Sequence, residues 1–144
     1  MKISILLPYK ENFSSIYAGA VSLFIRDMVK LSVFKDNITI YGNTTLKKIF
    51  KLRYKNINLK KNIVQSGSKL YVREFLKFEK ENPSDLIEIH NRPNYFHMIN
   101  KSFSKSNLVL YFHNDPLTMT GSRSIKERKF ILDNATKYLC PGIK

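Results

Sequence analysis

The sequence predicts an α/β fold built on a doubly wound, mostly parallel sheet with helices on both faces. Short apolar runs alternate along the 144 residues with longer stretches whose apolar side chains recur at helical spacing. Strands that alternate with helices pair in parallel, because each helix carries the chain back to the start of the next strand. Such a sheet holds its ligands beyond the carboxyl ends of its strands, so functional residues are expected there.

Six strands are expected, and each is a short run of apolar or aromatic residues that ends in polar, glycine or proline residues. They span residues 3–7, 38–41, 54–57, 86–90, 108–113 and 138–140, and the pattern is weakest at 54–57. The run at 108–113 is the strongest.

Five helices are expected between these strands. Their ranges are 18–32, 46–52, 68–81, 93–103 and a last helix that begins at Ser124. The first has its apolar side chains on one face, which is typical of a helix that covers a sheet. Pro93 suits the first turn of its helix. Ser124 and Glu127, three residues apart, form the sequence pattern of a capping box.

The formal net charge is +14, and it is unevenly distributed along the chain. Between Gly42 and Lys80 there are eleven Lys or Arg and two Glu, so this segment carries eleven minus two, or +9. An anionic partner is one interpretation: nucleic acid, a phosphorylated substrate or an acidic membrane surface. A solvated surface is the other, because the chain has 19 lysines and only 6 arginines, whereas bidentate phosphate recognition favours arginine.

Cysteine content and hydropathy exclude several classes of protein. The single Cys140 cannot build a disulfide framework or a zinc site. No apolar run reaches the roughly 18 residues of a membrane span, and residues 3–8 are too few for a secretory signal. We therefore expect a cytosolic chain of one domain, residues 1–144.

The loop after the first strand, residues 8–20, is one candidate site. It matches neither a dinucleotide fingerprint nor a Walker loop. It does place Gly19 and Ala20 where the next helix begins, and small residues there let an anion such as phosphate approach the free N–H groups of the helix. The alternative is a turn glycine that permits close helix packing.

The end of the fourth strand carries His90, Asn91 and Arg92, which combine a titratable ring, an amide and a fixed cation. The guanidinium of Arg92 suits a carboxylate or a phosphate. The alternative is a polar turn that connects a strand to a helix.

The end of the fifth strand has the same form, with His113, Asn114 and Asp115 followed by Pro116. His113 is suited to proton transfer or hydrogen bonding near neutral pH. Asp115 before proline also fits an Asx turn. Arg123 follows a polar loop at a helix start and suits phosphate, although a solvated surface position is the alternative. If the fourth and fifth strands are neighbours, both polar ends face one crevice.

Three segments of the chain resemble the GT-B glycosyltransferases of the large retaining family 4. The first is Ile5-Leu6-Leu7-Pro8 followed by Ala18-Gly19-Ala20-Val21-Ser22-Leu23. The second is Asp85 to Pro93, and the third is Leu108 to Pro116 with Ala135 to Cys140 behind it. Together they cover most of the chain, and residues 42–80 are matched least.

The resemblance implies two Rossmann-like domains that face each other across a cleft, the first for the acceptor and the second for the nucleotide sugar. This chain corresponds to the first. Gly19 and Ala20 would approach the donor diphosphate, and His113 would lie near the transferred sugar as the catalytic residue. The acceptor or sugar would be lined by His90, Asn91, Arg92, Asn114, Asp115 and Arg123. The co-substrate would be a nucleoside-diphosphate sugar, and neither a metal nor another cofactor is usually required.

Two departures accompany the resemblance. The usual pair of glycines is Ala18-Gly19 here, and the chain stops at Lys144, before a donor-binding domain. The expectation is therefore an acceptor-side domain cut short, inactive by itself, whose parent enzyme retains the sugar's configuration during cell-envelope polysaccharide or lipopolysaccharide synthesis. Its acceptor would be a glycan or lipid-linked hydroxyl, with peripheral contact to an anionic membrane and no nucleic-acid partner.

Two other readings stay open at this point. One is a non-catalytic α/β module that binds an anionic ligand or nucleic acid through the basic segment 42–80. The other is a flavodoxin-like domain that uses the same strand ends for a different phosphate ligand.

Overall fold

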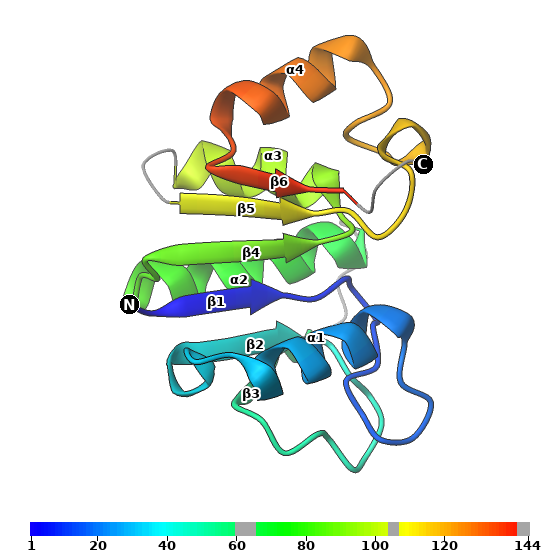
Figure 1. The fold of residues 1–144 in the computed structure, drawn as a ribbon, viewed down its shortest axis with the longest axis vertical. Helices are drawn as coiled ribbons and strands as arrows, with labels where there is room; N and C mark the ends of the chain where they lie inside the picture. The colour runs from blue at the N-terminus through cyan, green and yellow to red at the C-terminus, as the bar shows by residue number, and fades with distance from the viewer. Residues whose placement is uncertain (60–65, 104–106, 141–144) are drawn as a thin grey trace.

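The computed structural model describes residues 1–59, 66–103 and 107–140 of the chain (Figure 1). Six strands form one sheet in the order β3-β2-β1-β4-β5-β6, and all five pairings are parallel. The strands are β1 Ile3–Leu6, β2 Ile38–Gly42, β3 Tyr54–Asn56, β4 Leu86–His90, β5 Asn107–Tyr111 and β6 Lys137–Leu139. The predicted fold class, a doubly wound Rossmann-like α/β sheet, is confirmed.

Four α-helices and two short 3₁₀ turns connect the strands. They are α1 Ala20–Leu31, η1 Lys35–Asn37, α2 Gly67–Glu81, α3 Pro93–Ser102, η2 Pro116–Thr118 and α4 Ile125–Asn134. The expected capping box is present, since Ser124 Oγ accepts from the backbone N–H of Glu127 and the Glu127 carboxylate accepts from that of Ser124.

The helices divide unequally between the two faces of the sheet. In Figure 1, α1 lies in front of the strands, whereas α2 and α3 lie behind them. On the α1 face, Val21, Ile25 and Val29 recur every four residues and pack on alternate side chains of β1 and β2. Burying each such side chain stabilises the fold by roughly 1.5–3 kcal/mol. The larger apolar cluster lies on the other face, between the sheet and α2, α3 and α4.

The chain runs from β1 in the centre of the sheet to the outermost strand β3 and then returns to the centre with β4. The strand order therefore reverses between β1 and β4, which are hydrogen-bonded neighbours. Loops that leave the carboxyl ends of these two strands diverge to opposite faces, and ligands of such sheets bind in the resulting crevice.

The prediction of a helix at residues 46–52 is wrong. This segment is an irregular series of bends, Ile49 forms an isolated antiparallel bridge with Ser14, and Lys48 O accepts from the backbone N–H of Ser15 at 3.0 Å. Phe13, which is fully buried, stacks on Tyr54 and meets Phe50 edge-on, each at 5.1 Å between ring centroids. These contacts to a loop more than thirty residues earlier outweigh the local helical spacing.

A buried carboxylate ties the end of α2 to the central strand. Glu79 is 1% exposed, and it accepts hydrogen bonds from the Ser4 hydroxyl at 2.6 Å and from the backbone N–H of Ser84 at 2.9 Å. A buried charge persists only when hydrogen bonds replace its water. Here they do so within the scaffold, away from the strand ends that carry the candidate site.

Candidate functional site

The polar ends of β4 and β5 lie side by side, as expected if the two strands are neighbours. His90 is in register with Tyr111, and the backbone N–H of Asn91 donates to Tyr111 O at 2.7 Å. The strand expected to reach His113 ends at Tyr111 instead. His113 therefore starts the loop, directly beyond the sheet.

A carboxylate and two imidazoles form a hydrogen-bonded chain at this edge. Glu88 Oε1 lies 2.6 Å from His90 Nε2, and His90 Nδ1 lies 2.9 Å from His113 Nε2. An ionised carboxylate only accepts, so His90 donates its Nε2–H to Glu88. A neutral His90 then accepts at Nδ1 from His113, which leaves His113 Nδ1 as an acceptor. A protonated His90 donates instead, which leaves His113 Nδ1 as a donor. We call these three residues the Glu–His–His chain.

Aromatic rings enclose the two imidazoles. Tyr111 stacks on His90 at 5.3 Å with an interplanar angle of 11°, and on His113 at 4.9 Å. Phe24, on α1, meets His113 edge-on at 5.0 Å. His90 is fully buried in this setting. Since Phe24 lies in the first turns of α1, its ring contact places the start of that helix beside His113.

His113 is held in its neutral form. Burial is the largest cause and the nearby charge of His90 is the second, and together they lower the pKa of His113 from 6.5 to about 4, although Glu88 raises it. At neutral pH His113 is therefore a hydrogen-bonding group without charge. Its second nitrogen, Nδ1, has no hydrogen-bond partner among the described residues.

Asn91 fixes the backbone between the two histidines. Its φ of 54° lies in the left-handed region, which asparagine tolerates better than most residues. Its side-chain oxygen accepts from the backbone N–H of His113 at 3.3 Å, and its carbonyl accepts from Arg92 Nη1 at 2.8 Å. The turn His90-Asn91-Arg92 thus positions His113 as well as presenting its own side chains.

Arg92 and Arg123 line one pocket of about 340 Å³ with the start of α3 and residues 118–120. Arg123 Nε donates to Thr118 O at 3.0 Å, which leaves its other N–H donors for a ligand. Gly121 closes one side of the loop. Its φ is 96°, and a Cβ there would lie 2.5 Å from the backbone nitrogen of Asn94. His97 Nε2 holds the same loop by donating to Gly121 O at 2.7 Å.

Asn114 and Asp115 are exposed at the start of this loop. Asp115 Oδ1 accepts from the backbone N–H of Leu117 at 2.9 Å, which confirms the Asx turn that the sequence allowed. A role for either residue in binding a sugar stays a prediction.

The start of α1, where Gly19 and Ala20 were expected to meet a diphosphate, holds a carboxylate of the chain itself. Glu11 Oε1 accepts from the backbone N–H of Ser22 at 3.0 Å. A Cβ on Gly19 would come within 1.9 Å of that oxygen, so the glycine makes room for it. Any anion that uses these N–H groups must displace Glu11.

Sequence reasoning missed four contributors: Glu88, Tyr111, Phe24 and Glu11. Glu88 gives a readable signal, because a charged residue two positions before His90 on a strand shares its face. Phe24 has the helical spacing of the apolar face of α1, but it is 37% exposed beside the histidines. The sequence around Glu11 does not predict its role, because the contact with Ser22 depends on the conformation of the loop and not on residue spacing.

Within residues 1–59, 66–103 and 107–140, no group of three or more His, Cys, Asp or Glu is arranged to hold a metal ion. The helices of this part of the chain are too short or too polar to cross a membrane. Comparison with protein-family models, curated proteins and solved structures finds no match to this chain.

Proposed function

We propose that the chain is the acceptor-side domain of a retaining glycosyltransferase that uses a nucleoside-diphosphate sugar. The observation that carries the proposal is the Glu–His–His chain at the carboxyl edge of the sheet, beside the start of α1. This is where a doubly wound sheet holds its ligands. The resemblance of the segments around His113 and Gly19 to family 4 glycosyltransferases supplies the reaction class.

In this proposal His113 hydrogen-bonds a hydroxyl of the transferred sugar. With His90 neutral, the Nδ1 of His113 accepts from that hydroxyl, and Glu88 fixes the tautomer through His90. Because the pKa of His113 is about 4, the ring stays neutral at physiological pH. Its contribution is therefore orientation and hydrogen bonding that strengthen as charge develops on the sugar.

Glu11 sets the order of events at the start of α1. The donor diphosphate reaches the N–H groups of the helix only after the Glu11 carboxylate leaves Ser22, since two anions there repel each other. The donor's nucleoside would be bound by a second domain, and its binding energy would help to displace Glu11.

Binding of nucleoside-diphosphate sugars to this chain tests the proposal. Imidazole NMR signals of His113 are followed while a panel of nucleoside-diphosphate sugars, the matching nucleoside diphosphates and inorganic pyrophosphate are added to millimolar concentration. We expect the sugar-bearing compounds to shift the His113 signals more than the compounds without a sugar. An equal shift with pyrophosphate contradicts the proposal, as does the absence of any shift at His113 in the Glu11→Gln variant, which lacks the competing charge. The His90→Asn variant, which breaks the Glu–His–His chain, should reduce the shift.

A second candidate function rests on the pocket that Arg92 and Arg123 share. Two guanidinium groups beside Thr118 and Thr120 fit a phosphate group, as in a flavodoxin-like domain with another phosphate ligand. Titration with inorganic phosphate separates the two candidates. Phosphate binding that Arg123→Gln abolishes, without any response at His113 to the nucleotide sugars, would favour this second function.

A further inference from the structure

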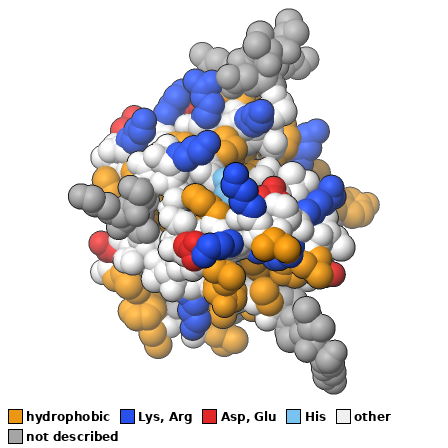
Figure 2. Space-filling view, turned by 90° about the horizontal axis from the view of Figure 1, so that it is seen from above, with side chains coloured by type: hydrophobic (Ala, Val, Ile, Leu, Met, Phe, Trp, Pro, Cys, Tyr) orange, Lys and Arg blue, Asp and Glu red, His pale blue; other side chains and the backbone are white. Residues whose placement is uncertain are grey.

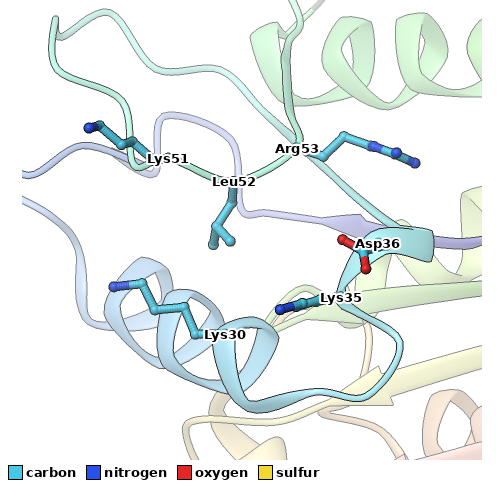
Figure 3. Close-up of a pocket in the computed structure, with 6 residues that line it drawn as sticks. All are labelled: Lys30, Lys35, Asp36, Lys51, Leu52 and Arg53. Carbon is cyan, nitrogen blue, oxygen red and sulfur yellow. The ribbon is translucent and has the colours of Figure 1, made fainter.

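A basic pocket lies at the opposite edge of the sheet, where β2 and β3 begin (Figure 3). Its volume is about 500 Å³. Three segments contribute to it: the last turn of α1, the turn η1 and the residues that precede β3. The lining residues are Lys30, Lys35, Asp36, Lys51, Leu52 and Arg53. Four basic side chains and one carboxylate thus line the pocket, a net charge of four minus one, or +3.

These cations are not used by the fold. All four are exposed. In the part of the chain that the structure describes, the side chains of Lys35, Lys51 and Arg53 make no hydrogen bond or ion pair. The charge of Lys30 contributes to lowering the pKa of the Asp27 carboxyl, which is itself paired with Arg26 at 2.7 Å. Cations gathered without partners raise the local potential and attract anions.

Exposed apolar side chains lie between two of the lining residues, Lys30 and Lys35, in the chain. Leu31 and Val33 are 87% and 90% exposed, and Phe34 is 46% exposed. They follow Lys30 and precede Lys35 in the chain, so apolar and cationic side chains project from one short segment. Large exposed aliphatic side chains cost solubility and mark interaction surfaces when they cluster. We call this set, Lys30, Leu31, Val33, Phe34, Lys35, Lys51 and Arg53, the basic–apolar surface.

We propose that the basic–apolar surface binds the face of an anionic lipid bilayer. Lysine and arginine near such a bilayer are attracted by its acidic headgroups, and adjoining apolar side chains enter the boundary with the acyl chains. A bilayer uses both kinds of side chain at once. Nucleic acid would use the cations and leave Leu31 and Val33 in water.

This surface differs from the one that the sequence suggested. Of the basic residues that the structure describes between Gly42 and Lys80, only Lys51 and Arg53 line the pocket, and the end of α1 with η1 supplies Lys30 and Lys35. Figure 2 shows Lys and Arg side chains spread over the end of the molecule that carries α4, with hydrophobic side chains among them.

A tryptophan reporter tests the proposal, because the chain has no tryptophan. Phe34→Trp places one in the basic–apolar surface, and Tyr138→Trp places one on β6 as a matched control. Vesicles of phosphatidylcholine with and without phosphatidylglycerol are added at low and high salt. We expect a blue shift for Phe34→Trp with the acidic vesicles only, weakened by salt, and no shift for Tyr138→Trp.

Charge and apolar variants then separate a bilayer from other anions. Lys30→Gln with Lys51→Gln should lower partition onto acidic vesicles about 25-fold, from about fivefold for each charge. The control pair Lys69→Gln with Lys126→Gln removes the same charge from α2 and α4 and should change partition about twofold at most. Leu31→Ser with Val33→Ser should lower vesicle binding about tenfold or more and leave binding of a short DNA duplex unchanged.

Three outcomes would overturn the proposal. They are absence of binding to acidic vesicles at low salt, an equal loss in the control pair, and tighter binding of duplex DNA that the apolar variants do not alter. Binding of inorganic phosphate alone, without vesicle binding, would assign the pocket to a small anion. No donor or acceptor enters these measurements, so the result is independent of the proposed glycosyl transfer.

Discussion

The two edges of the sheet treat charged and polar side chains in opposite ways. At the carboxyl edge, Glu88, His90 and His113 are hydrogen-bonded in series and enclosed by aromatic rings. At the amino edge, Lys35, Lys51 and Arg53 are exposed around an open pocket. The groups at the carboxyl edge are held by hydrogen bonds and should contribute to the stability of the fold. The groups at the amino edge are exposed and should contribute to the binding of anionic partners. Substitutions should therefore affect stability at one edge and binding at the other.

The largest expected effect is on stability at the carboxyl edge. Glu88→Ala removes the acceptor beneath the fully buried His90 and should lower the free energy of unfolding by about 3 kcal/mol, because the donor loses its partner. Lys51→Ala is the matched control at the amino edge and should change it by about 0.5 kcal/mol at most. Urea denaturation of both variants checks this. Equal losses would remove the contrast between the two edges.

Gly121→Ala should cost about 2 kcal/mol, since alanine disfavours a φ of 96° and its Cβ would meet Asn94. The change should also move the loop that carries Arg123. Thermal unfolding measures the first effect, and the NMR signals of residues 118–123 report the second. If the variant is as stable as the unsubstituted chain, the close approach of Gly121 to the start of α3 does not require glycine.

Lowering the pH should weaken the carboxyl edge selectively. The pKa of His113 is about 4 in the folded chain and 6.5 in the unfolded chain. Between these values the unfolded chain binds more protons, so stability falls as pH decreases from about 6.5 to 4. His113→Asn should make this part of the stability–pH curve flatter, while Lys30→Gln should leave its slope unchanged. Denaturation at a series of pH values compares the three proteins.

The smallest expected effect is at the start of α1. Glu11→Gln removes the charge that accepts from Ser22, so it should cost about 0.5 kcal/mol of stability and raise the affinity for inorganic pyrophosphate. Calorimetric titration of both proteins measures the affinity. Unchanged or weaker binding would mean that Glu11 does not compete for these N–H groups.

Much of this comparison was accessible from the sequence, because strand ends and helix starts are local features. The alternation of strands and helices predicted the sheet, and the polar residues after β4 and β5 predicted the crevice. Contacts between distant segments were not accessible. Phe13 packs on Phe50 within the irregular segment 46–52, and the Glu11 carboxylate occupies the start of α1, where the sequence suggested a phosphate. The basic–apolar surface also needed the fold, since α1 and the residues before β3 are far apart in sequence.

An NMR pH titration of the His113 imidazole tests most directly whether burial beside His90 holds a neutral ring at the carboxyl edge. We predict a midpoint near pH 4 and a neutral His113 at pH 7. We also predict one dominant tautomer, fixed by the contact between His113 Nε2 and His90 Nδ1. A midpoint near 6.5, with two tautomers in exchange, would show that the ring is solvated and free of His90, and would contradict the account.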